Sequence, residues 1–175
     1  MKKANKIVYI ALGLLLVIVV ILALLNKGDQ ELRRALEENR EFIVRIDGAD
    51  AAVVSLQDII DLRPQEFTTT FGTSATPPRD TTLRGVELRI LLELLDIDIT
   101  GASRIMVTGL DSYYSPLTVS EAMQEGGVYI CYSMDGEILK PQSEGGFGPF
   151  MMVMRGSRFA QRWCKYVEAV DVISS

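Results

Sequence analysis

The run D-S-Y-Y contains three side chains that could orient a polar ligand. Asp111, Tyr113 and Tyr114 follow a strand-forming run that Gly109 ends. A carboxylate and phenols in a loop at a strand end can hold a ligand by hydrogen bonds. The alternative is structural, with Asp111 capping the turn and one tyrosine packed with its hydroxyl group satisfied. The sequence leaves both interpretations open.

Sulfur is the second candidate source of chemistry. The chain has two cysteines, Cys131 and Cys164. A disulfide between them would close a loop of about 34 residues and stabilise the fold by roughly 3 to 4 kcal/mol. The alternative is two buried free thiols, which the apolar surroundings of Cys131 favour. The methionines of F-M-M-V-M, Met151, Met152 and Met154, are expected to pack rather than to bind metal.

Composition excludes several classes of function. The chain has no histidine, so histidine-dependent nucleophilic catalysis and histidine-ligated metal sites are excluded. Four of the 18 basic residues flank an apolar N-terminal segment: Lys2, Lys3, Lys6 and Lys27. Without them, 14 basic residues stand against 23 acidic ones, a net charge of minus 9. Phosphate backbones repel such a surface, so no nucleic-acid partner is expected.

Residues 7–25 are uncharged and long enough, at about 1.5 Å per helical residue, to cross the roughly 30 Å hydrocarbon layer. We expect a single transmembrane anchor here, after a cytoplasmic N-terminus of residues 1–6. The lysines before the segment place the rest of the chain outside the cell membrane. The alternative is a cleaved signal peptide, but the apolar run is long, and Ala23 is followed by a poor cleavage site.

The remaining chain predicts a short juxtamembrane spacer helix over residues 26–41 and one domain over residues 42–175. Its central stretch is expected to be a helix after Gly85, buried on most of its circumference, followed by a strand over residues 104–108. Short strands alternate with short helices, and Ser55 and Thr118 each begin a capping box. This pattern predicts an α+β fold with mixed or antiparallel sheets.

The order of these pieces resembles the oxidoreductase molybdopterin-binding domain, the fold of the sulfite-oxidase family. The resemblance covers residues 42–173. It is carried by the following motifs: I-D-G, S-L-Q-D-I, L-R-G-V-E-L-R-I-L-L, D-S-Y followed by P-L-T-V-S-E-A, M-D-G-E-I-L, G-F-G-P-F-M-M-V and W-C-K-Y-V-E-A-V-D-V. It implies the family's fold and a molybdopterin cofactor.

The departures from the family pattern concern the metal. Catalytic members have a cysteine that ligates molybdenum in a C-x-G-N-like setting, where this chain has T-T-T-F-G-T-S with Thr70 two residues before Gly72. A hydroxyl group is a poor substitute for a soft thiolate. The family's glycine in D-G-Y is Ser112, and the arginine usual after G-P-x is Met151. The resemblance therefore implies a degenerate member without the molybdenum ligand.

The resemblance also implies where a pterin would be held. The candidate cofactor-binding residues are Thr70, Gly72, Arg79, Arg84, Asp111 and Tyr113. Arg79 and Arg84 flank the loop in question and could hold an anionic group, although surface arginines in an acidic domain are commonly salt-bridge partners.

We therefore predict a membrane-anchored, extracytoplasmic, non-catalytic binding or accessory module. One alternative is a molybdopterin-dependent oxidoreductase with an atypical metal site. The other is a structural envelope protein that binds a protein partner around Tyr113.

Overall fold

The structure is a computed structural model that describes residues 2–72, 77–156 and 160–175, leaving out the side chains of residues 2–11, 24–26 and 29. The chain divides into two units, Met1–Ala35 and Leu36–Ser175. Each is described by itself.

The first unit is helical and belongs to α1 (Lys2–Asn39). The bulky apolar side chains between residues 12 and 22 are all exposed, from 43% at Ile18 to 66% at Leu16. Within the described part of the chain, no helix has the length and apolarity of a membrane span. The predicted anchor at residues 7–25 includes residues 7–11 and 24–26, whose side chains lie outside the described residues, so the anchor stays a prediction.

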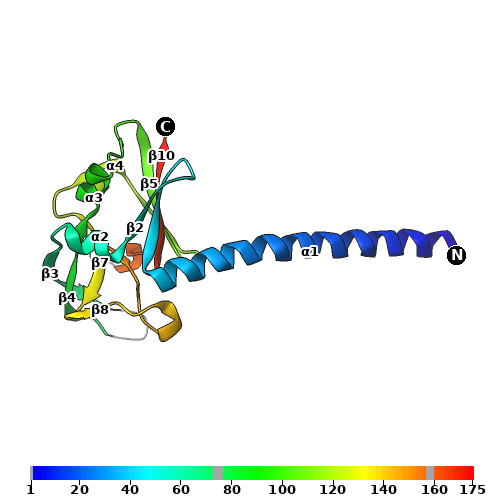
Figure 1. The fold of residues 1–175 in the computed structure, drawn as a ribbon, viewed down its shortest axis with the longest axis horizontal. Helices are drawn as coiled ribbons and strands as arrows, with labels where there is room; N and C mark the ends of the chain where they lie inside the picture. The colour runs from blue at the N-terminus through cyan, green and yellow to red at the C-terminus, as the bar shows by residue number, and fades with distance from the viewer. Residues whose placement is uncertain (1, 73–76, 157–159) are drawn as a thin grey trace. The chain divides into compact units, whose positions relative to one another are not determined.

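Five strands form a mixed sheet in the second unit (Figure 1). Its order is β2-β1-β10-β5-β6, with β1 and β10 parallel and the other neighbours antiparallel. Asp47 (φ 51°) and Gly48 (φ 79°) make the predicted two-residue turn between β1 and β2. The strands are β1 (Glu41–Ile46), β2 (Ala49–Ser55), β5 (Ala102–Gly109), β6 (Tyr114–Leu117) and β10 (Val167–Ser174).

The other sheet is antiparallel and has the order β3-β4-β7-β8, with β9 also pairing with β7. The two sheets share one hydrophobic core. At this core the Phe42 ring of β1 meets Phe150 edge-on, with centroids 5.0 Å apart. The strands are β3 (Gln65–Phe71), β4 (Arg79–Glu87), β7 (Val128–Met134), β8 (Glu137–Ile138) and β9 (Met151–Met154). The predicted α+β class with mixed and antiparallel sheets is confirmed.

Local signals predict two of the short helices well. Ser55 and Asp58 form a reciprocal capping box at α2 (Leu56–Asp61), and Thr118 and Glu121 form another at α4 (Val119–Met123). The described residues also contain two single 3₁₀ turns, η1 (Gln142–Glu144) and η2 (Ala160–Arg162).

The prediction for the central helix needs correction. The strand β4 begins at Arg79 and continues through Gly85 to Glu87, where the helix was expected to have begun. A Cβ atom on Gly85 would lie 2.3 Å from the carbonyl oxygen of Ile130, so glycine allows the close approach of β4 to β7. Strand pairing between residues distant in sequence thus overrides the helical pattern.

The helix that remains, α3 (Leu88–Leu94), has seven residues and is less buried than predicted. Leu88, Leu91 and Leu92 lie in the core, but Leu94 is 59% exposed. The helix covers the core with one face only.

Candidate functional site

The end of the β3–β4 hairpin carries three of the predicted site residues. The exposed Thr70 hydroxyl group donates to Asp80 Oδ1 across the hairpin at 3.1 Å. At Gly72, a Cβ atom would lie 2.9 Å from Pro78 Cα, so a larger residue would displace the backbone. Arg79 forms an ion pair with Asp135, with Nη2 and Oδ2 2.7 Å apart. Arg79 therefore has the salt-bridge role that the sequence left as an alternative.

Arg84 lies apart from this cluster. It is five residues further along β4, or roughly 16 Å at the usual rise of a strand. It is exposed, and its register neighbours are Glu66 on β3 and Ser133 on β7. The two predicted arginines are thus not brought together.

Asp111 and Tyr113 make hydrogen bonds within the β5–β6 turn and from the turn to η2. Asp111 Oδ1 accepts a hydrogen bond from the Tyr113 amide at 3.1 Å. The Tyr113 hydroxyl group donates a short hydrogen bond to the Gln161 carbonyl oxygen. Tyr113 is 40% exposed and Tyr114 59% exposed. The structure contains the turn-capping arrangement that the sequence left as the alternative, and it leaves Tyr114 accessible.

Sequence reasoning missed Lys165, which joins these two regions. Its ammonium nitrogen lies 4.4 Å from the ring centroid of Phe147 and 5.8 Å from that of Phe71. The Trp163 ring stacks on Phe71, with centroids 5.5 Å apart and planes 9° apart. The cation thus lies over an aromatic cluster next to Gly72. A lysine in the otherwise apolar run W-C-K-Y was the available signal.

The electrostatics at Lys165 connect it to Asp111. Burial lowers the pKa of Lys165, and the nearby Asp111 carboxylate partly opposes this by raising it. Burial raises the pKa of Tyr166, and the same carboxylate raises it further. A partly desolvated ammonium group next to aromatic rings is a suitable group to hold an anion that also has a planar ring.

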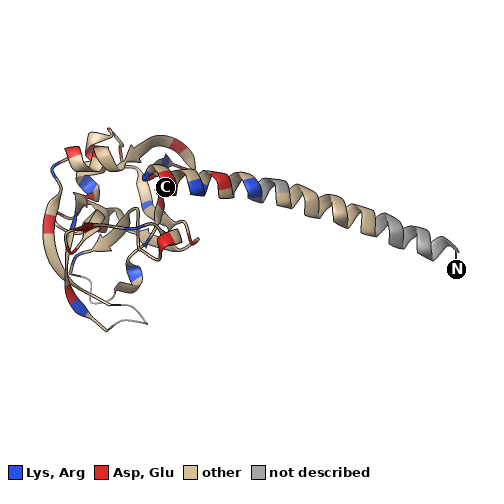
Figure 2. Ribbon diagram, turned by 60° about the horizontal axis from the view of Figure 1, so that its bottom comes forward, with Lys and Arg blue, Asp and Glu red and all other residues tan. Residues whose placement is uncertain are grey.

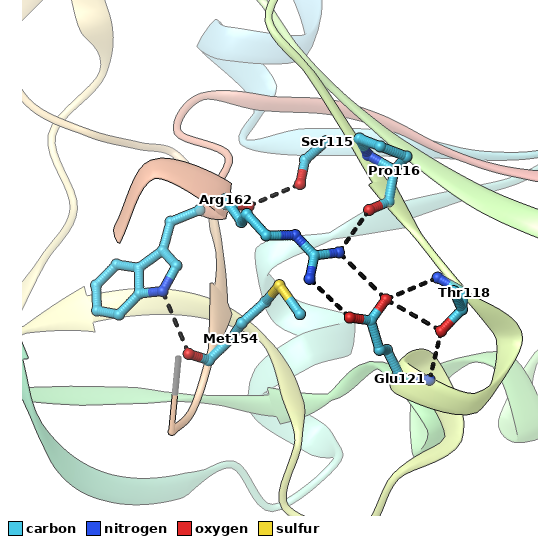
Figure 3. Close-up of polar contacts among 7 residues, drawn as sticks. Ser115, Pro116, Thr118, Glu121, Met154 and Arg162 are labelled. Carbon is cyan, nitrogen blue, oxygen red and sulfur yellow. Dashed lines mark hydrogen bonds and ion pairs between the residues drawn. The ribbon is translucent and has the colours of Figure 1, made fainter. Parts of the chain in front are cut away.

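A set of polar contacts fixes the segment that carries Lys165 (Figure 3). Arg162 Nη1 and Nη2 donate to the two carboxylate oxygens of Glu121 at 2.6 and 3.1 Å, and Nη2 also donates to the Pro116 carbonyl oxygen at 2.9 Å. Ser115 Oγ donates to the Arg162 carbonyl oxygen at 2.7 Å. The segment is therefore attached to β6 and α4, and its position is set before any ligand binds.

The donor set does not fit molybdenum. Cys131 and Cys164 are free thiols that are each 0% exposed. The disulfide considered from the sequence is not formed, and the alternative of two buried thiols holds. Burial raises the pKa of Cys131 far above its ordinary value and that of Cys164 to about 12. Both thiols are enclosed in the core and burial disfavours their thiolate forms, so neither is placed as an open ligand for a metal. Across the described ranges, no group of three acidic or cysteine side chains could hold a metal ion.

The methionines of β9 do not alter this conclusion. Met151, Met152 and Met154 are buried in the core, as expected for packing residues.

The two-sheet fold described above is that of a known protein family. The family model of the oxidoreductase molybdopterin binding domain matches residues 33–175. The chain belongs to this family and has its sulfite-oxidase-type fold, which confirms the resemblance seen in the sequence.

One solved structure illustrates the likeness. The chain is similar to the sulfane dehydrogenase SoxCD from Paracoccus pantotrophus, with a TM-score of 0.62 and 16% sequence identity. The match covers 77% of this chain and 38% of that one, so this chain spans well under half of that protein. At this identity the likeness shows the fold. No curated protein matches the chain.

Proposed function

We propose that this protein is a membrane-anchored, extracytoplasmic domain of the molybdopterin-binding type that binds a ligand without molybdenum catalysis. The observation that carries the proposal is the donor set. The threonine at the family's ligand position, Thr70, has its hydroxyl group bonded to Asp80 on an exposed hairpin. The two thiols of the chain are buried, and burial raises the pKa of each. The family's fold is retained, and the side chain that would bind the metal is not.

The proposed anchor is supported by the N-terminal segment. Residues 7–25 contain no charge. The described part of this segment accordingly carries neither basic nor acidic colour on the ribbon (Figure 2), and the bulky apolar side chains of residues 12–22 are exposed. Exposed apolar surface of this length is stable in lipid and unfavourable in water. Lys2, Lys3 and Lys6 precede it, which favours a cytoplasmic N-terminus and an outside domain.

The proposed ligand is a small molecule with an anionic group and a planar ring. Lys165 supplies the cation, the partly buried Phe147 supplies an apolar ring beside it, and the buried Phe71 supports both from below. A pterin with a phosphate group has this chemistry. Asp111 and Gly72 border the same region, so of the residues predicted for the cofactor we retain these two and add Lys165. Arg84 has no part in the proposed site.

The test is the pterin content of the purified full-length protein. The chain is produced in a host that loads a catalytic relative, and the relative is purified beside it. Bound pterin is released by oxidation and measured by fluorescence. We expect pterin to be retained by the wild type and lost from Lys165→Met. Arg104→Met, which changes an exposed cation on β5, is the matched control and should retain it.

The outcomes separate the alternatives. If the wild type contains no pterin while the relative is loaded, pterin is excluded as the ligand and the protein has the family's fold without its cofactor. In that case the structural alternative, a protein partner at Tyr113 and the exposed Tyr114, becomes the next hypothesis. Stoichiometric molybdenum would overturn the proposal in favour of an oxidoreductase with an atypical metal site.

A further inference from the structure

The chain reverses direction sharply where α3 ends. The Leu95 amide donates to the Leu91 carbonyl oxygen at 3.1 Å, and the Ile97 amide donates to that of Leu92 at 3.0 Å. Between them Asp96 has a φ of 55°, in the left-handed region where glycine is usual. Residues 96–100 after this reversal lie beside Leu92 and Glu93 of the helix.

A hollow of about 270 Å³ lies at this reversal. Its apolar lining is Leu92, Ile97 and Ile99, together with Met123 of α4. Met123 is 42% exposed, so one side of this apolar lining faces solvent. Ligand pockets usually measure about 300 to 1,000 Å³, so this hollow suits one bulky side chain better than a cofactor. It is separate from the proposed ligand site at Lys165 and does not depend on it.

The rim of the hollow is acidic. Of the described residues that line it, Glu93, Asp96 and Asp98 are acidic and none is basic. The nearest cation along the helix, Arg89, is held by Glu87 with Nε and Oε2 2.7 Å apart. Hydrogen bonds from the Thr100 amide and hydroxyl group lower the pKa of Asp98. The rim is therefore negative at neutral pH.

We propose that this hollow docks a cationic segment of a partner protein. The segment inserts one bulky apolar side chain between Ile97 and Met123, and its lysines or arginines face Glu93, Asp96 and Asp98. A second copy of this chain would bring the same acids and be repelled. An anionic lipid surface would be repelled for the same reason. Opposite charges would also speed the encounter with a basic partner.

The test uses the full-length protein in phosphatidylcholine nanodiscs and a fluorescent heptapeptide with a central phenylalanine between two pairs of lysines. Fluorescence anisotropy should show saturable binding above that to empty nanodiscs. Met123→Ser should weaken binding about tenfold through the lost apolar contact. Glu93→Gln with Asp96→Asn should weaken it about fivefold at low salt, with no such difference at 0.5 M salt.

Matched variants lie on β8. Ile138→Ser changes a side chain that is 46% exposed, and Glu137→Gln removes an exposed acid. Both should bind the peptide as the wild type does. The proposal is overturned by the absence of saturable binding, by equal binding of a peptide with serine in place of phenylalanine, or by equal losses in the β8 variants. Protection of residues 92–100 from amide exchange by phosphatidylglycerol nanodiscs alone would assign the hollow to lipid and also overturn it.

Discussion

The contact between Glu121 and Arg162 gives the most quantitative prediction (Figure 3). Arg162, with smaller contributions from the Thr118 amide and hydroxyl group, lowers the pKa of Glu121 from 4.5 to about 2. A shift of this size corresponds to about 3 kcal/mol if fully expressed. The Arg162 side chain is 44% exposed and that of Glu121 31% exposed, so solvent screens the pair. We therefore expect about 1 to 2 kcal/mol.

The perturbation is Glu121→Gln, which removes the charge and keeps an oxygen that can accept from the Thr118 amide. Because folding lowers the pKa, the stabilisation is fully present above about pH 4.5 and is lost as the pH falls toward 2. The variant should thus be about 1 to 2 kcal/mol less stable at pH 7, and the difference should shrink below pH 4.5.

The assay is urea unfolding of the full-length protein in detergent micelles, followed by fluorescence. Trp163 is the single tryptophan, is 4% exposed, and follows Arg162 directly, so it reports on this region. Glu137→Gln on β8 is the control for removal of an exposed acid. A loss below about 0.3 kcal/mol at pH 7, or a difference that stays constant from pH 7 to 3, would refute the reasoning.

Three further predictions follow from the packing. Gly85→Ala should lower the free energy of unfolding by several kcal/mol or prevent folding, because its Cβ atom would lie 2.3 Å from the Ile130 carbonyl oxygen. The control is Gly101→Ala, where no atom lies within 4 Å of the added Cβ atom, and it should unfold like the wild type in a thermal unfolding assay. Cys131 and Cys164 should resist alkylation at pH 8 in the folded protein and react in urea, as measured by mass spectrometry; rapid labelling of the folded protein would contradict their burial. Lys165→Met should be at least as stable as the wild type in urea, because it removes a cation whose pKa burial lowers; a loss above about 1 kcal/mol would show that Lys165 serves the fold and not a ligand.

The sequence predicted the features that depend on neighbouring residues. The capping boxes of Ser55 with Asp58 and Thr118 with Glu121 are local hydrogen-bonding patterns, and the structure has both. The turn at Asp47 and Gly48 is likewise local. The extension of β4 to Glu87 was missed because it depends on pairing with β7, about 45 residues further along the chain.

The same distinction applies to the site. The prediction that a threonine, Thr70, stands where the family has its ligand needed only the sequence, because it concerns one position in a motif. The location of Lys165 was not, because the rings of Phe71 and Phe147 meet it only through tertiary packing. Leu94 belongs to the helix that was predicted to be buried on most of its circumference, and the structure leaves it 59% exposed.

The central claim is that the family's fold is retained here without its metal chemistry. The most direct measurement is the molybdenum content per chain of the full-length protein, determined by mass spectrometry beside a catalytic relative produced in the same host. We predict a molybdenum content at background level while the relative is fully loaded. One molybdenum per chain would contradict the account and would direct mutagenesis to Thr70 and its neighbours for the unrecognised ligand.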